Sequence, residues 1–302
     1  MRAARFEQYG GPEVLEIVDL PDPHPGPGQV RIAVRAVGVS ASDPKLRAGT
    51  LNFGAPLPST TGAEVAGVVD ELGEGVTDVA VGDRVFGISD DHAGAAEYAL
   101  ITYRAPIPRS LGFVDAAGLP VALETATRVL DQLEVGAGTT VLLSGASGGI
   151  GSVAVQLANA RGARVIGTAS AANQHYLRLL GAEPVVYGDG LVDRVRAVSP
   201  DGADVAVDIA GSGVLGELIE LTGGADRVLT VADMDGATTH GVHFSNGFAD
   251  GNAFHAMSTI GELIDAGRFW LPVERTFPLD AIADAHRWSE TGRVRGRLAL
   301  VV

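Results

Sequence analysis

The spacing of hydrophobic positions divides the chain into stretches with different rhythms. In residues 1–118, short runs that alternate or are wholly apolar recur between turns rich in Gly, Pro and Asp. Val30, Ile32 and Val34 alternate with polar or small residues, which predicts a half-buried strand. Further strands are expected at 14–18, 63–72, 83–87 and 96–101. We therefore expect this stretch to be rich in β-structure.

From residue 119 the pattern changes to strands that alternate with helices. The expected strands are 140–144, 164–168, 184–187, 204–209, 226–231 and a sixth at 241–244, and the expected helices are 122–133, 150–160, 173–180, 191–198 and 214–221. This alternation predicts βαβ units around a parallel sheet. After about residue 249 the pattern breaks again, into helix, strand, helix and a final strand.

Length and composition agree with a globular α/β protein. The 302 residues correspond to roughly two domains at about 150 residues each. With 22 basic and 37 acidic residues the net charge is −15, which disfavours nucleic acid and anionic membranes as partners. The N-terminal residues hold no apolar signal core, so we expect a cytoplasmic protein.

Two residue counts limit the chemistry. The chain has no cysteine, which excludes disulfides, thiolate nucleophiles and cysteine-ligated zinc. Lys45 is the sole lysine. Since it precedes the glycine turn described next, the Tyr-x-x-x-Lys pair that short-chain dehydrogenases carry after such a turn is absent.

The strongest local signal is TVLLSGASGGIG at residues 140–151. It follows an apolar strand and opens a helix, as a dinucleotide-binding turn requires. Small residues let the backbone approach a pyrophosphate, and the helix N-terminus supplies N–H donors. We expect Ser147, Gly148, Gly149 and Ile150 to hold the cofactor; a tight turn without a ligand is the alternative.

The end of the second strand indicates which cofactor is bound. NAD-preferring sites place Asp or Glu near this point to bond the ribose 2′-hydroxyl. Here Thr168, Ser170 and Asn173 are neutral, which favours NADPH. No arginine occupies this position, and Arg178, the next one along, is expected on a solvated helix face.

Several segments in order resemble the medium-chain dehydrogenase/reductase superfamily, specifically its zinc-free quinone oxidoreductase branch. The resemblance spans nearly the whole chain. The segments are GGPEVLEIVDLPDP, AVGVSASDPKLRAG, TTGAEVAGVV, GEGVTDVAVGDRVFG, LLSGASGGIGSVAVQLA and the closing RTFPLDAIADAHRWSETGRVRGRLALVV. It implies a GroES-like catalytic domain at 1–118, a Rossmann domain at 119–248 and a return to the first domain over 249–302. Pairing of Rossmann sheets in the family makes a homodimer an expectation.

The resemblance also implies roles for particular residues. Ser40, Asp43 and Lys45 fall in the family's catalytic segment, although the family usually has Asn in place of Ser40 and often Tyr in place of Lys45. The other implied cofactor contacts are Thr125, Tyr187, Ala210 and Val231, and the implied substrate-pocket residues are Leu51, Phe53 and Phe248. A bond from the Thr125 hydroxyl to the backbone of its own helix is the alternative for that residue.

The zinc ligands of related dehydrogenases are replaced. The Gly-His-Glu-x-x-Gly segment of zinc enzymes reads Gly-Ala63-Glu64-Val-Ala-Gly here, and Ser40 stands in place of a ligand cysteine. His240 and His243 form a ligand-like pair without an evident third ligand, so we expect no metal site. For Glu64 we favour a buried structural carboxylate, held by an arginine or by backbone donors, over a catalytic one.

Without a Lewis acid, hydride transfer needs an acceptor that is already electrophilic. Quinones and α,β-unsaturated carbonyls meet this condition, since the incoming charge spreads to a remote oxygen. We therefore expect a zinc-independent NADPH-dependent reductase of a quinone or enone. The alternatives are an NADPH-binding sensor or structural protein without turnover, and an alcohol dehydrogenase with an altered metal site.

Overall fold

The computed structural model describes residues 1–51 and 56–302, and the Phe248 side chain is outside the described part. The chain separates into two compact units. Unit 1 comprises Met1–Val121 and Phe254–Val302, and unit 2 comprises Ala122–Ala253. Both boundaries lie a few residues beyond those expected from the sequence.

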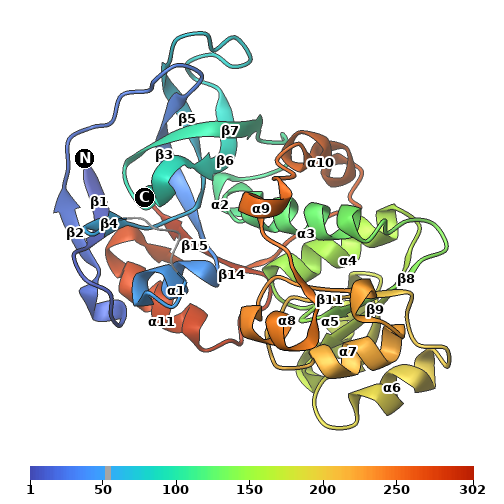
Figure 1. The fold of residues 1–302 in the computed structure, drawn as a ribbon. Helices are drawn as coiled ribbons and strands as arrows, with labels where there is room; N and C mark the ends of the chain where they lie inside the picture. Colours follow the sequence, from blue (N-terminus) through green and yellow to red (C-terminus); the bar gives the residue numbers. More distant parts are fainter. Residues whose placement is uncertain (52–55) are drawn as a thin grey trace. The chain divides into compact units, whose positions relative to one another are not determined.

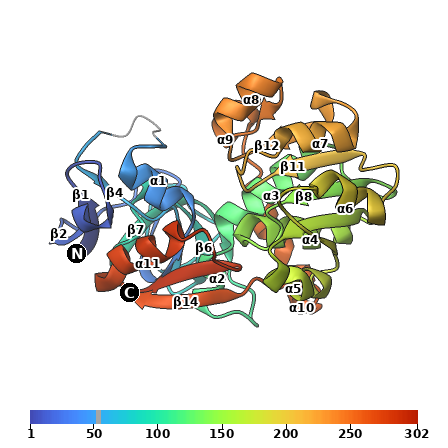
Figure 2. The same ribbon diagram turned by 90° about the horizontal axis from the view of Figure 1, so that it is seen from below.

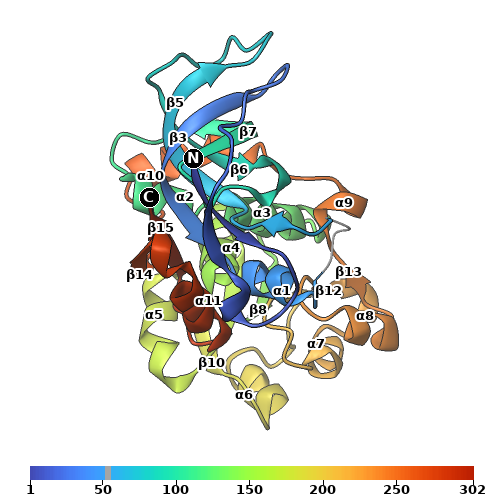
Figure 3. The same cartoon turned by 90° about the vertical axis from the view of Figure 1, so that its left-hand side faces the viewer.

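Unit 1 is built on a six-stranded sheet in the order β14-β15-β3-β5-β6-β7. These strands are β14 (Val273–Pro278), β15 (Arg297–Val301), β3 (Val30–Val39), β5 (Glu64–Leu72), β6 (Arg84–Ser89) and β7 (Tyr98–Pro106). Strand β3 also pairs with β7, so that β3, β5, β6 and β7 form a closed, barrel-like ring of strands. Figure 3 shows β3 and β5 side by side, and Figure 1 shows the C-terminal β15 beside β3.

The length and irregularity of β3 explain how it serves three partners. It pairs with β5, β7 and β15, and its register with β5 shifts twice. Such irregularities bend a strand, which lets one ten-residue strand join two parts of a closed sheet. Val30, Ile32 and Val34 are buried, as their alternation predicted.

Smaller elements complete unit 1. They are β1 (Arg2–Phe6), β2 (Glu16–Asp19), α1 (Ser42–Ala48), β4 (Ser59–Thr60), α2 (Phe113–Ala117), α10 (Ala256–Asp265) and α11 (Ile282–Glu290). Strands β2, β1 and β4 form a separate three-stranded sheet. Helix α11 lies next to α1 and along β14 and β15 (Figure 2), and it buries Ile282 and Ala285 in the core.

Unit 2 contains a six-stranded parallel sheet in the order β10-β9-β8-β11-β12-β13. Its strands are β8 (Thr140–Ser144), β9 (Arg164–Ala169), β10 (Glu183–Val186), β11 (Val205–Asp208), β12 (Val228–Thr230) and β13 (His243–Phe244). The helices are α3 (Pro120–Gln132), which begins in unit 1, α4 (Gly149–Ala160), α5 (Gln174–Leu179), α6 (Leu191–Val198), α7 (Leu215–Thr222), α8 (Met234–His240) and α9 (Gly247–Asp250). Numbered from the first strand, the order is 3-2-1-4-5-6, that of a Rossmann fold.

Six short strands and helices were not predicted: β1, β4, α1, α2, α8 and α9. Strand β1 is five residues long, and helices α1 and α8 are seven residues each. Helix α1 contains Pro44, and α8 contains Gly236 with two threonines, so neither has strong helix propensity. Asp233 caps α8 by accepting a hydrogen bond from the Gly236 amide at 2.8 Å.

Candidate functional site

The glycine turn joins β8 to α4 in unit 2. Gly145 has a φ of +83°, which favours glycine, and the Gly148 amide donates to the Gly145 carbonyl at 3.2 Å. A Cβ on Gly151 would lie 2.3 Å from the Gly145 oxygen, whereas a Cβ on Gly148 would lie 3.7 Å from it. Gly151 is thus required by packing, and Gly148 leaves space above the first turn of α4. The N-terminus of α4, with no side-chain cap on Gly148, presents its amides there.

The end of β9 braces this turn. The Thr168 carbonyl accepts from the Ala146 amide at 3.0 Å, and the Thr168 hydroxyl oxygen accepts from the Gly145 amide at 3.3 Å. The Asn173 amide donates to the Ser147 hydroxyl at 3.3 Å. Thr168 is 1% exposed, so its contribution is to hold the turn. The structure therefore brings together Thr168, Asn173 and Ser147, which the sequence assigned to one site.

Gln174 has a role that the sequence analysis missed. Its side-chain nitrogen donates to the carbonyls of Ala169, Ser170 and Val185 at 3.0, 3.1 and 3.3 Å. These bonds fix the course of the chain just after β9. The only available signal was a polar residue five positions after the end of β9, and it does not specify such bonds.

Two buried polar residues shape the loops after β11 and β12. Asp208 is 0% exposed, and its Oδ1 accepts from the amides of Ala210 and Gly211 at 3.2 and 3.0 Å. Its Oδ2 accepts from the Thr230 hydroxyl at 3.0 Å. The Val231 amide donates to the Asp208 carbonyl at 3.0 Å. Asp208 thereby holds the backbone of both predicted cofactor residues, Ala210 and Val231, at the carboxyl end of the sheet, where ligands bind in such folds.

Two further predicted cofactor residues of unit 2, Thr125 and Tyr187, lie outside these loops and differ in their exposure. Thr125 lies on α3 and is 6% exposed, and its hydroxyl donates to the Glu124 carboxylate at 3.0 Å rather than to the backbone. Tyr187 follows β10 and is 57% exposed. Arg178 lies on the exposed side of α5, as expected.

In unit 1, Ser40 and Asp43 form a buried brace at the start of α1. They are 3% and 1% exposed. The Ser40 amide and hydroxyl both donate to Asp43 Oδ2, at 2.7 and 2.8 Å. Since a carboxylate only accepts, the Ser40 hydrogen is used there, and the Ser42 hydroxyl, 2.6 Å away, donates to Ser40.

Lys45 differs from Ser40 and Asp43 in its exposure. It lies on the exposed side of α1, and its carbonyl accepts from the amides of Thr50 and Leu51 at 3.0 and 3.1 Å. Leu51 is partly exposed. Phe53, predicted with Leu51 in the substrate pocket, lies outside the described residues, as does the side chain of Phe248.

Glu64 occupies the interior of unit 1. Its carboxylate accepts from the Val121 amide at 2.9 Å and pairs with Arg297 at 3.0 Å. Burial raises the pKa of Glu64 to about 7, against the opposing effects of Arg297 and the Val121 amide. The predicted structural carboxylate, held by an arginine and a backbone donor, is thus confirmed.

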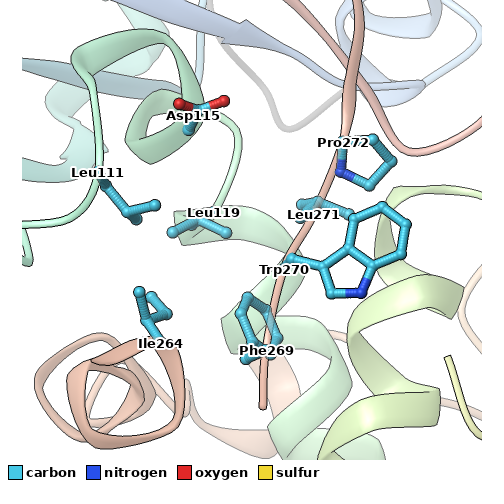
Figure 4. A pocket seen from close by; sticks show the side chains of 8 residues that line it. All are labelled: Leu111, Asp115, Leu119, Ile264, Phe269, Trp270, Leu271 and Pro272. Atoms are coloured by element: carbon cyan, nitrogen blue, oxygen red, sulfur yellow. The ribbon is translucent and has the colours of Figure 1, made fainter. Parts of the chain in front are cut away.

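An apolar cavity of about 260 Å³ also lies in unit 1 (Figure 4). Phe269, Leu119 and Ile264 converge on it, and Trp270 and Asp115 stand at its margin. Its only charged lining group is Asp115, so its lining offers no cationic side chain to a dinucleotide.

Comparison with known proteins decides the family. A model described as "Alcohol dehydrogenase GroES-like domain" matches residues 26–126, and one described as "Zinc-binding dehydrogenase" matches residues 180–300. The quinone oxidoreductase of Rattus norvegicus is 36% identical over 241 residues, which cover 76% of this chain and 73% of that protein. The chloroplastic NADPH-dependent alkenal/one oxidoreductase of Arabidopsis thaliana is 31% identical, over 99% of this chain and 79% of that protein. The solved quinone oxidoreductase from Coxiella burnetii superposes with a TM-score of 0.88 at 32% identity, over 100% of this chain and 99% of that one.

The chain belongs to the medium-chain dehydrogenase/reductase superfamily, in its zinc-free quinone oxidoreductase branch.

Membership in this superfamily gives the two units their names: unit 1 is the GroES-like domain and unit 2 the Rossmann domain. The protein is therefore an oxidoreductase of this superfamily.

Within residues 1–51 and 56–302, no three His, Cys, Asp or Glu side chains are grouped so as to hold a metal ion. His243, one of the ligand-like pair, instead bonds to Asp250 at 3.1 Å. No helix in the same ranges is long and apolar enough to cross a membrane.

Proposed function

We propose that this protein is an NADPH-dependent reductase that transfers hydride to a quinone or an α,β-unsaturated carbonyl without a zinc ion. One observation carries the proposal. A complete glycine turn, braced by Thr168 and Asn173, occurs in a chain with Ala63 and Ser40 at the positions where zinc relatives have ligands. The turn supports binding of a nicotinamide cofactor, and the replaced ligand positions support a reaction without Lewis-acid activation of an alcohol.

The residues present fit a dinucleotide. The open space above Gly148 and the uncapped N-terminus of α4 suit a pyrophosphate. The end of β9 carries the neutral residues Thr168, Ser170 and Asn173 in place of the Asp or Glu that bonds the ribose 2′-hydroxyl of NADH. This supports NADPH over NADH. The residues proposed to hold the cofactor are Thr125, Ser147, Gly148, Gly149, Ile150, Thr168, Ser170, Asn173, Tyr187, Ala210 and Val231. When bound, the cofactor supplies the hydride.

Unit 1 supplies the proposed groups for the acceptor. Charge develops on the acceptor oxygen as hydride arrives, and an oriented donor there stabilises the transition state. We assign this role to Lys45, because it is cationic and exposed on α1. Ser40 and Asp43 are buried, so they act by holding the start of α1. Leu51, Phe53 and Phe248 are the proposed apolar lining of the substrate pocket, and a cytoplasmic homodimer is the proposed form.

Cofactor titration followed by turnover assays tests this proposal. NADPH and NADH are titrated into the purified protein, and oxidation of each is followed with benzoquinone-type and enone acceptors. We expect tighter binding of NADPH and its oxidation by at least one of the two acceptor classes. Absence of NADPH oxidation with every acceptor would overturn the enzymatic proposal.

A second candidate is a protein that binds NADPH without turnover. The observation that favours it is the burial of Ser40 and Asp43, which are bonded to each other and leave Lys45 as the exposed polar group of the predicted catalytic set. The same assays separate the two candidates, since this one predicts NADPH binding with no hydride transfer to either acceptor class.

A further inference from the structure

A buried ion pair on helix α3 is left unused by the proposed function. Glu124 and Arg128 are 8% and 7% exposed, and Arg128 Nε lies 2.7 Å from Glu124 Oε1. Charges buried in this way are costly unless each is paired and hydrogen-bonded. The partners of this pair therefore indicate what it holds.

The first partner is Thr125. Its hydroxyl donates to Glu124 Oε2 at 3.0 Å. A hydroxyl has one hydrogen, and a carboxylate accepts only, so the hydrogen of Thr125 is committed to Glu124. The lone pairs of Thr125 are left to accept. A primary carboxamide such as that of nicotinamide carries an N–H₂ donor, which matches a group restricted to accepting.

The second set of partners lies in residues 245–253. The Ala253 amide donates to Glu124 Oε1 at 3.4 Å, and Arg128 donates to the Ser245 hydroxyl. Ser245 in turn donates to Gln132 of α3 at 2.6 Å. The ion pair therefore holds both ends of the segment that carries Phe248, as well as the hydroxyl of Thr125.

We propose that Glu124 is a positioning residue for hydride transfer, acting through Thr125, with Arg128 maintaining its charge and its place. The inference rests on the proposed function, because it takes Thr125 to contact the nicotinamide. Glu124 fixes the direction in which Thr125 accepts, and the same carboxylate fixes the end of segment 245–253. Loss of the pair misorients the cofactor ring without removing the phosphate-binding turn.

A mutant cycle tests this role. Thr125→Val removes the hydroxyl at constant size. Glu124→Met with Arg128→Met removes both charges together with the acceptor of the Thr125 hydroxyl, which avoids an unpaired buried charge. Each change is expected to lower kcat about tenfold, the loss of one hydrogen bond, with little change in the KM for NADPH. Combining all three substitutions is expected to cause no further loss, because Glu124 acts through Thr125.

The control and the isotope readout separate positioning from general destabilisation. Asp131→Asn with Arg161→Met removes a more exposed pair, 2.8 Å apart, that also involves α3 and is expected to leave kcat unchanged. The primary deuterium isotope effect on kcat with NADPH deuterated at C4 should rise in the Thr125 and Glu124/Arg128 variants. A fall in thermal midpoint with an unchanged isotope effect would show a structural role only and overturn the proposal.

The remaining outcomes are also decisive. Multiplicative losses in the triple variant would mean that Glu124 and Thr125 act independently, against the proposal. If the wild type binds NADPH without oxidising it, the turnover proposal fails, and the positioning role in hydride transfer fails with it. If the wild type oxidises NADPH while the variants keep its kcat and isotope effect, the positioning role alone is overturned. The NADPH Kd of the variants, measured by fluorescence titration, is expected to stay close to that of the wild type. If NADPH does not bind, both proposals are overturned.

Discussion

Arg297 lies 3.0 Å from Glu64 in the interior of the GroES-like domain, where their side chains are 5% and 0% exposed. Arg297 also donates to the Gly118 carbonyl at 3.0 Å, and Glu64 accepts from the Val121 amide. The pair thus joins the C-terminal strand β15, strand β5 and the start of α3. Breaking such a pair leaves an uncompensated buried charge and costs about 3–5 kcal/mol, even where the intact pair contributes little.

The first prediction concerns Glu64 and pH. With a folded-state pKa of about 7 against 4.5 for the unfolded chain, the folded protein retains a proton over this interval that the unfolded chain releases. Glu64 therefore contributes stability that is present below pH 4.5 and lost as pH rises through 7, by about 3 kcal/mol. Glu64→Gln should remove this dependence. Urea unfolding at several pH values checks it: the free energy of unfolding of the variant relative to wild type should increase from pH 5 to 7, and a constant difference would contradict the prediction.

The second prediction concerns His286 and has the opposite sign. Burial lowers the pKa of His286 to about 4. The negative charge of Asp43 opposes this shift, and the positive charge of Arg47 adds to it. The unfolded chain binds a proton between pH 4 and 6.5 that the folded protein excludes, so stability is lost by about 3 kcal/mol as pH falls through this interval. His286→Leu removes the effect. Because Glu64 and His286 oppose each other, the wild type should change little between pH 4.5 and 6.5, whereas Glu64→Gln should gain stability with rising pH and His286→Leu should lose it. Parallel profiles for the two variants would refute this.

The third prediction separates two glycines of the turn. Gly151→Ala places a Cβ 2.3 Å from the Gly145 oxygen and 2.6 Å from Ala146 Cα, so the free energy of unfolding should fall by about 1–3 kcal/mol or more. Gly148→Ala meets its nearest atom at 3.7 Å and should fold normally. Its added methyl group occupies the space proposed for the pyrophosphate, so NADPH affinity should fall at least about tenfold. Thermal unfolding and fluorescence titration measure the two effects, and normal NADPH binding by Gly148→Ala would argue against the proposed site.

The fourth prediction concerns Lys45. If its ammonium group stabilises the acceptor oxygen, Lys45→Met should lower kcat by about 10²-fold, with NADPH affinity and thermal midpoint unchanged. Lys45→Arg keeps the charge and should retain part of the activity. Stopped-flow measurement of NADPH oxidation provides the test, and wild-type kcat in Lys45→Met would remove Lys45 from the mechanism.

Local patterns were sufficient for most of the Rossmann domain, with the exception of its short helices α8 and α9. Its strands and helices are consecutive in the chain, and buried parallel strands are nearly continuous apolar runs, so β8, β9 and α4 could be located from residues 140–169 alone. Short elements were harder. Asp43, in the first turn of helix α1, accepts from the Ser40 amide and hydroxyl, and no helical periodicity marks the seven residues of the helix.

The sequence by itself determined the glycine turn, the neutral end of β9 and the absence of zinc ligands at positions 40 and 63, because these depend on residue identity within short segments. Only the tertiary structure decided that Glu64 meets Arg297, 233 residues away, and that Glu124 holds both Thr125 and the Ala253 amide. Burial and partners depend on how distant segments pack, and a carboxylate in the sequence looks the same whether it faces water or an arginine. For the same reason, Ser40 and Asp43 were indistinguishable from Lys45 until the fold placed them inside and Lys45 outside.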